Sequence, residues 1–135
     1  MNILLIDDEP AIRETLQLCL ELNGHTVLAA ADGPAGVRLA AQLPDLILCD
    51  VGLPGLDGYG VLAAIRQLPA SRDIPFIFLT ALAGPDDQRR GMSLGANGYI
   101  AKPFTQRDIL DAIETHGRPP PAGPGSAAGA EPPPR

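Results

Sequence analysis

The sequence lacks the features by which membrane, secreted and zinc-binding proteins are usually identified. No apolar run approaches the length of a membrane span, and Met1 leads directly into a predicted strand, without the basic flank and cleavage site of a signal peptide. The chain has only two cysteines, Cys19 and Cys49, which lack the C-x-x-C spacing, and it has no cluster of histidine and cysteine. Neither a disulfide framework nor a zinc site is therefore expected. We expect a protein of the reducing cytoplasm that does not enter a membrane.

Positive charge is also scarce. Ten Lys and Arg residues against 16 Asp and Glu residues give a formal net charge of −6 at pH 7. This balance argues against sequence-independent binding to nucleic acid and against binding to an anionic membrane surface. Lys102 is the only lysine, so a chain that otherwise uses arginine places its one compact ammonium at this position.

Composition divides the chain into two parts. A hydrophobic content of 45% over 135 residues is enough for one globular domain with an adequate core. From Gly117 onward the composition collapses to Pro, Gly and Ala, and such a segment cannot bury enough apolar surface to offset its ordering. We therefore predict one folded domain over residues 1–116 and a disordered tail or linker over residues 117–135.

Short apolar runs alternate with helix signals along the folded part. Strands are expected at residues 2–6, 25–30, 46–49, 76–79 and 98–101. Helices are expected from Pro10 to the stop at Asn23-Gly24, after Gly33-Pro34, over residues 61–68 with Asp57 as the cap, after Pro85, and after Thr105. Continuous apolar runs suit strands buried on both faces of a parallel sheet. The pattern predicts an α/β fold, a flavodoxin-like doubly wound sheet of five parallel strands in the order 2-1-3-4-5, with helices on both faces.

Four of the apolar runs end in polar residues, which are Asp7-Asp8, Asp50, Thr80 and Lys102. The carboxyl ends of parallel strands meet at one edge, where ligands bind in this kind of sheet. Three carboxylates there repel one another unless a cation neutralises them, and oxygen ligands suit Mg²⁺. A carboxylate beside Mg²⁺ can attack a phosphoryl group, and Asp50 is the best candidate because it stands alone after the central strand. Lys102 and Thr80 would then neutralise phosphoryl oxygens.

Each of these residues also has an ordinary structural interpretation. An Asp pair before a helix is most often a cap, which taken alone is the favoured interpretation of Asp8. A threonine that ends a strand is usually a turn residue, and a single lysine is usually solvated. Asp57 is interpreted as a cap, and His25 and His116 as structural or surface residues. The joint appearance of the polar residues at the strand ends favours a phosphoryl-transfer site.

The motifs resemble the receiver domain of bacterial two-component response regulators over residues 2–115. They are Ile6-Asp7-Asp8-Glu9-Pro10, Asp50-x-x-Leu-Pro-Gly-Leu-Asp57-Gly58, Leu79-Thr80-Ala81 and Gly95-Ala96-Asn97-Gly98-Tyr99-Ile100-x-Lys102-Pro103-Phe104. The resemblance implies that Asp50 is the phosphoacceptor. It implies that Asp7 or Asp8, Asp50 and the backbone carbonyl of Gly52 contact Mg²⁺. It further implies that Thr80 and Tyr99 form a switch pair, that Lys102 contacts the phosphoryl group, and that the Lys102–Pro103 bond is cis.

Three functions are weighed on this basis. The leading one is a phosphorylation-activated switch that takes a phosphoryl group from a histidine kinase or a phosphotransfer protein, and that catalyses only its own phosphorylation and dephosphorylation. The second is a receiver-like scaffold that works without phosphorylation, which would usually have lost an acid or the lysine. The third is a Mg²⁺-dependent phosphatase, disfavoured because Val51 and Gly52 follow Asp50 in place of an Asp-x-Asp motif and because no Gly-rich loop follows the first strand.

The expected partners are the kinase or phosphotransfer protein and a downstream effector. The surface expected to respond to phosphorylation comprises the helix after Pro85, the strand at residues 98–101 and the last helix, and it would bind the partner or a second copy of the domain. Gly52 and Leu82 stand where polar side chains can speed dephosphorylation in the resembling family. Neither can position a water, which favours a long-lived phosphoryl group.

Overall fold

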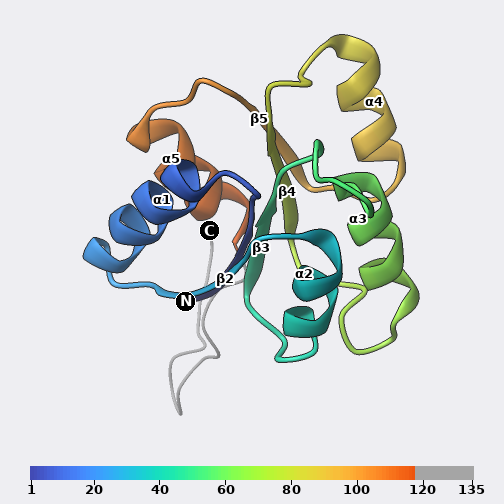
Figure 1. Ribbon diagram of the computed structural model, residues 1–135, viewed down its shortest axis with the longest axis horizontal. Helices are drawn as coiled ribbons and strands as arrows, with labels where there is room; N and C mark the ends of the chain where they lie inside the picture. The colour runs from blue at the N-terminus through green and yellow to red at the C-terminus, as the bar shows by residue number, and fades with distance from the viewer. Residues whose placement is uncertain (118–135) are drawn as a thin grey trace, which may run out of the picture.

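A computed structural model describes residues 1–117 and arranges them as one sheet between two layers of helices (Figure 1). The strands are β1 (Asn2–Ile6), β2 (Thr26–Ala30), β3 (Leu46–Cys49), β4 (Phe76–Thr80) and β5 (Gly98–Ala101). Neighbouring strands pair in parallel in the order β2-β1-β3-β4-β5. The predicted fold class and strand order are confirmed.

The helices divide between the two faces of the sheet, as right-handed crossovers require when the strand order reverses at β1. The helices are α1 (Pro10–Leu22), α2 (Gly33–Ala40), α3 (Gly58–Gln67), α4 (Pro85–Ser93) and α5 (Gln106–His116). Figure 1 shows α1 and α5 on one face and α2, α3 and α4 on the other. Loops at the carboxyl ends of β1, β3, β4 and β5 therefore open at the same edge.

The two faces of the sheet form two separate cores. On β1, Ile3 and Leu5 belong to the core under α1 and α5, whereas Leu4 and Ile6 belong to the core under α2 and α3. All four side chains are 0% exposed. This double burial explains why β1 reads as a continuous apolar run and not as an alternating one.

The predicted helix starts are largely confirmed. Asp57 caps α3 by accepting a hydrogen bond from the Gly60 amide at 2.9 Å. Thr105 and Asp108 form the predicted capping box of α5. The expected range of the third helix was wrong at its start, because α3 begins at Gly58, directly after its cap.

The predicted tail, apart from Gly117, lies outside the described residues, so its boundary stays a prediction. Within residues 1–117, no helix is long and apolar enough to cross a membrane.

Candidate functional site

Three carboxylates meet where β1 and β3 end side by side. The parallel ladder continues one residue beyond the strands, because the Asp50 amide donates to the Ile6 carbonyl at 3.0 Å. This backbone pairing places Asp50 next to the Asp7-Asp8 pair. One oxygen from each of the three carboxylates lies within 4.8 Å of the others. Asp7 and Asp50 are buried and Asp8 is exposed, so the cluster is open to solvent on the Asp8 side.

Lys102 binds two of these carboxylates. Its Nζ donates to Asp7 Oδ2 at 2.9 Å and to Asp50 Oδ2 at 3.1 Å. A longer contact of 3.4 Å joins the same Nζ to Glu9 Oε1. The Lys102–Pro103 peptide is cis, as the resemblance implies. The structure thus brings together Asp7, Asp8, Asp50 and Lys102 from chain segments up to 95 residues apart.

Burial and charge oppose each other in this cluster. Burial raises the pKa of Asp7, although the Glu9 amide and Lys102 both stabilise its ionised form. Burial by itself would lower the pKa of Lys102, but its hydrogen bonds and charge interactions with Asp7 and Asp50 raise it. The ammonium therefore stays charged and the carboxylates exceed it in number. The cluster retains excess negative charge that a further cation can neutralise.

The second group of predicted residues meets at the backbone of Leu82. Thr80, 1% exposed, accepts a hydrogen bond at Oγ1 from the Leu82 amide at 3.1 Å. The Tyr99 hydroxyl donates to the Leu82 carbonyl at 2.6 Å. Tyr99 is half-buried and packs against Phe78 with ring centroids 5.4 Å apart. Burial, followed by the hydrogen bond with Tyr59, raises the pKa of Tyr99 well above its usual range.

Gly52 lies beside the candidate phosphoacceptor. Its amide donates to Asp50 Oδ1 at 3.2 Å. A Cβ added at Gly52 would lie 4.0 Å from that oxygen, at ordinary van der Waals distance from the carboxylate. Glycine leaves this approach open.

Sequence reasoning missed three residues around the site. Glu9 contacts Lys102, Arg13 Nη1 donates to the Asp7 carbonyl at 2.8 Å, and Tyr59 lies within 3.3 Å of the Tyr99 hydroxyl. The proximity of Glu9 and Arg13 to Asp7 in sequence was the available signal for those two. Asp8 does not cap α1, because Glu9 occupies the cap position without a side-chain hydrogen bond.

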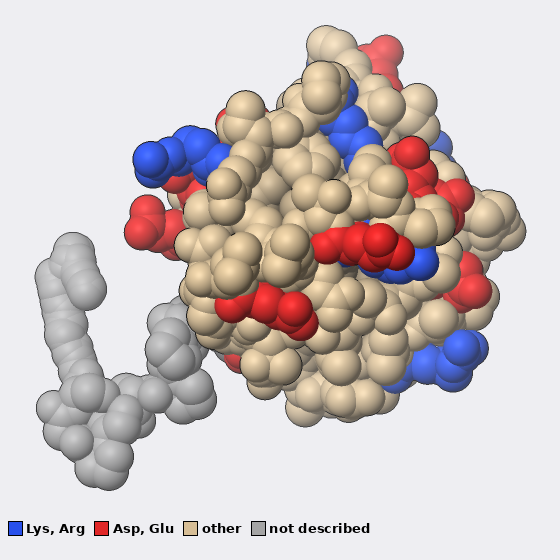
Figure 2. Space-filling model, turned by 60° about the vertical axis from the view of Figure 1, so that its left-hand side comes forward, with Lys and Arg blue, Asp and Glu red and all other residues tan. Residues whose placement is uncertain are grey.

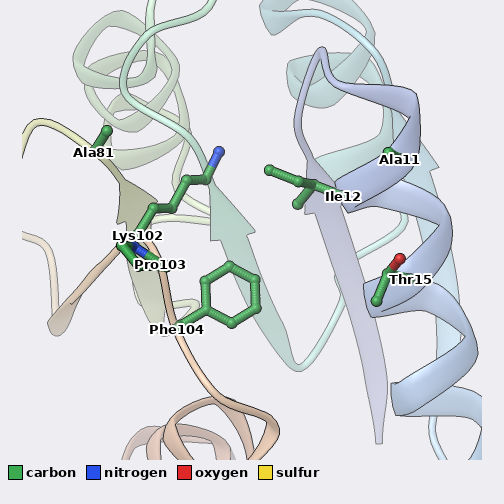
Figure 3. Close-up of a pocket in the computed structure, with 7 residues that line it drawn as sticks. All are labelled: Ala11, Ile12, Thr15, Ala81, Lys102, Pro103 and Phe104. Carbon is green, nitrogen blue, oxygen red and sulfur yellow. The ribbon is translucent and has the colours of Figure 1, made fainter.

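A hollow of about 580 Å³ lies beside Lys102. It is lined by Ala11, Ile12, Thr15, Ala81, Lys102, Pro103 and Phe104. Figure 3 shows Ile12 on α1 and the Lys102 side chain extending toward one another across it. A second hollow shares Thr15 and Phe104 with the first and is lined also by Leu18 and Leu22 on α1. Figure 2 shows that the side of the molecule carrying α1 and α5 is largely uncharged, with scattered acidic and basic side chains.

The family model of the response regulator receiver domain matches residues 3–114. The transcriptional regulator RpaA of Synechocystis sp. is 42% identical over 113 residues, which are 83% of this chain and 47% of RpaA. The transcriptional regulatory protein AfsQ1 of Streptomyces coelicolor is 44% identical over 112 residues, which are 82% of this chain and 48% of AfsQ1. The chain thus spans about half the length of these relatives.

Solved structures agree with this assignment. The chemotaxis protein CheY4 of Vibrio cholerae superposes with a TM-score of 0.82 at 28% identity, covering 85% of this chain and 97% of CheY4. The receiver domain of the sensor histidine kinase PA1611 of Pseudomonas aeruginosa, solved with a magnesium ion in its active-site cleft, superposes with a TM-score of 0.79 at 36% identity, covering 85% of this chain and 95% of that domain. With its five-stranded sheet and its cluster of acids beside a lysine, the chain belongs to the response regulator receiver domains, the phosphorylation-activated switches of two-component signalling.

Proposed function

We propose that Asp50 stores the signal as an acyl phosphate. The observation that carries this proposal is the shared ammonium: Lys102 binds both Asp50 and Asp7, with Asp8 beside them, at one open edge of the sheet. An Asp50 carboxylate oxygen attacks the phosphorus of a donor phosphohistidine. A P–O bond forms, the P–N bond breaks, and its electron pair returns to the donor imidazole. Lys102 faces the oxygens on which negative charge is then held.

The donor set fits a magnesium ion. Asp7, Asp8 and Asp50 offer hard oxygen ligands within 4.8 Å of one another, and Lys102 offsets only part of their charge. We infer that these three carboxylates and the Gly52 carbonyl hold the ion. When bound, Mg²⁺ would lower the repulsion between the carboxylates and an incoming phosphoryl group. The chain acts on no other substrate in this proposal, and catalyses only its own phosphorylation and dephosphorylation.

The phosphoryl group is read through Thr80 and Tyr99. The Thr80 hydroxyl accepts a hydrogen bond from the Leu82 amide. Turning that hydroxyl toward a phosphoryl oxygen would break this hydrogen bond. Tyr99 holds the carbonyl of the same residue. A phosphoryl group at Asp50 would therefore affect the β4–α4 loop through two hydrogen bonds of Leu82, one from its amide to Thr80 and one from Tyr99 to its carbonyl. The surface formed by α4, β5 and α5 would then bind a downstream effector or a second copy of the domain.

The phosphodonor would approach over the hollow beside Lys102. Lys102 lines this hollow and binds Asp50 at 3.1 Å, so a donor seated over the hollow would lie near the phosphoacceptor. The hollow offers apolar contacts from Ile12, Pro103 and Phe104. Leu18 and Leu22, 59% and 76% exposed, extend the apolar surface along α1. A helical surface of a histidine kinase or phosphotransfer protein fits this apolar surface of α1, because apolar side chains of the partner helix would cover Leu18 and Leu22.

Labelling of the whole chain tests the proposal. Phosphoramidate with Mg²⁺ should add one phosphoryl group, detected by intact mass, and peptide mapping should place it on Asp50. EDTA should prevent the labelling, and Asp50→Asn should abolish it. Full labelling of Asp50→Asn, or labelling indifferent to EDTA, would overturn the proposal and leave the phosphorylation-independent scaffold as the alternative.

A further inference from the structure

Tyr59, in the first turn of α3, has two hydrogen-bond partners for one proton. Its ring is 6% exposed, lies edge-on to Phe78 with centroids 5.3 Å apart, and has the Arg90 guanidinium carbon 4.2 Å from its centroid. Its hydroxyl oxygen is 3.3 Å from the Tyr99 hydroxyl and 3.3 Å from the Asp87 carbonyl oxygen. A phenol carries one proton, so Tyr59 donates to one of these oxygens at a time.

The hydrogen bonds around Tyr99 decide the direction of donation. At 2.6 Å, the bond from the Tyr99 hydroxyl to the Leu82 carbonyl is the shortest in this group and takes the Tyr99 proton. Between the two tyrosines, Tyr59 is therefore the donor and Tyr99 the acceptor. The Leu82 amide in turn donates to Thr80. Thr80, Leu82, Tyr99 and Tyr59 thus form one continuous chain of hydrogen bonds.

Tyr59 also adjoins the phosphoacceptor through the backbone. The amide of Gly58 donates to the Val51 carbonyl at 2.8 Å. A Cβ on Gly58 would lie only 2.3 Å from the Asp50 carbonyl oxygen, so the first turn of α3 rests directly on the Asp50–Val51 backbone. The neighbouring Tyr59 side chain reaches the first turn of α4 and β5. This connection between the site and the responding surface does not pass through Thr80.

We propose that Tyr59 is a positioning residue of the switch, whose hydroxyl donates either to Tyr99 on β5 or to the Asp87 carbonyl on α4. The additional acceptor favours the position that Tyr99 has in this structure, called inward here, in which its hydroxyl reaches the Leu82 carbonyl. In the outward position that hydrogen bond is broken. This inference rests on the proposed function, because it takes Tyr99 as the residue that reports phosphorylation. When Tyr99 turns outward, the Tyr59 proton passes to Asp87. When Tyr99 is inward, the first turn of α4 competes with it for that proton.

Tyr59→Phe tests the proposal, since phenylalanine keeps the ring between Phe78 and Arg90 and removes only the hydroxyl. The probe is beryllofluoride with Mg²⁺. For each α4 and β5 amide, the wild-type chemical shifts without and with beryllofluoride define a line. The readout is the position of the variant's resonance along that line. Tyr59 keeps Asp87 as an acceptor when Tyr99 is outward, so removing its hydroxyl takes away only the second acceptor that the inward state offers. The ratio of inward to outward Tyr99 in the unliganded variant should therefore fall by about twofold, moving these resonances away from the bound position. No displacement along this line would overturn the proposal.

Two further variants separate the hydroxyl from packing. Arg90→Gln perturbs the same ring but keeps the hydroxyl, and it should leave the ratio unchanged; a displacement as large as that of Tyr59→Phe would overturn the proposal. In a chain that already carries Tyr99→Phe, adding Tyr59→Phe should shift the ratio much less than it does alone. Equal shifts in both backgrounds would show that Tyr59 does not act through the Tyr99 hydroxyl.

Labelling of Asp50 distinguishes this inference from the proposed function. Tyr59 makes none of the hydrogen bonds that reach the Asp50 carboxylate, so Tyr59→Phe should label with phosphoramidate at the wild-type rate. A wild-type chain that does not label at Asp50 would overturn the proposed function itself. Normal labelling of both chains with unchanged α4 and β5 resonances in Tyr59→Phe would overturn only the role of Tyr59.

Discussion

Lys102 and Arg66 are both partly buried cations, but they lie at opposite ends of the strands and bind different kinds of partner. Lys102 binds carboxylates that outnumber it, at the edge where the strands end. Arg66 binds neutral oxygens before β4 and β5 begin: its Nη1 donates to the Ile74 carbonyl at 2.7 Å, and its Nη2 to the Gly95 carbonyl at 2.9 Å and to Asn97 Oδ1 at 3.1 Å.

The difference separates a site from a structural clamp. A compact ammonium can shift among several carboxylate oxygens and accommodate a newly arrived phosphoryl group. A planar guanidinium with fixed donors holds three chain segments in one geometry. Burial lowers the pKa of Arg66 without displacing it from the charged range. At the carboxyl ends of the strands, the carboxylates outnumber Lys102, which suits a ligand-binding site. At the other end, Arg66 binds neutral oxygens, which suits a structural role.

Replacing each cation by the other type should have different effects: the change at Lys102 should slow labelling, and the change at Arg66 should lower stability. The largest effect is expected at Lys102. Lys102→Arg keeps the charge, but a larger, planar group misfits a position in which Asp7 and Asp50 share one compact ammonium. We expect labelling of Asp50 by phosphoramidate to slow by at least about tenfold, with little change in melting temperature. Wild-type labelling in this variant would show that the single lysine is accidental.

The reverse exchange is the matched control. Arg66→Lys keeps the charge but cannot reach Ile74, Gly95 and Asn97 together, so the part-buried bond to the Ile74 carbonyl or the exposed bonds to Gly95 and Asn97 are lost. We expect a loss of about 0.5–1.5 kcal/mol in the free energy of unfolding, seen as a melting temperature a few degrees lower. Labelling of Asp50 at 25 °C should proceed at the wild-type rate. Slower labelling of Asp50 in Arg66→Lys with an unchanged melting temperature would contradict a purely structural role of Arg66.

A pair of glycines sharpens the comparison within α3. Gly58→Ala would place a Cβ 2.3 Å from the Asp50 carbonyl oxygen and 2.7 Å from Val51 Cα, and backbone atoms cannot give way cheaply. We expect about 1–3 kcal/mol of destabilisation and slower labelling, because the phosphoacceptor loop must shift. Gly60→Ala makes its one short contact, 2.5 Å, with the end of the Leu56 side chain, which can move, and it should be closer to neutral since alanine favours the helix. Thermal melting and labelling of both variants test this, and equal effects would contradict it.

The smallest effect is expected from the end of the chain. Removal of residues 118–135 should leave the melting temperature and the labelling of Asp50 nearly unchanged, because their Pro-, Gly- and Ala-rich composition offers little apolar surface to bury. Both measurements on the truncated chain decide the matter. A melting temperature lowered by several degrees would mean that this segment contacts the domain.

Much of the site could be located from sequence because its residues directly follow predicted strands. Asp50 and Lys102 were placed at one edge by the parallel topology alone, and the structure brings them within 3.1 Å. The capping role of Asp57 followed equally from local rules. Tyr59 and Arg66 were not singled out, since each reads as an ordinary member of an amphipathic helix.

The sequence by itself determined the order of strands and helices, the burial of β1, β3 and β4, and the gathering of acids at the carboxyl ends of the strands. These depend on local periodicity, caps and the handedness of crossovers, which act within a few residues or one βα unit. Only the tertiary structure decided which oxygen Lys102 binds, that Leu82 is held by both Thr80 and Tyr99, and that Tyr59 lies between Tyr99 and Asp87. Such contacts join side chains distant in sequence, and their geometry is set by the packing of helices on the sheet, which no local pattern encodes.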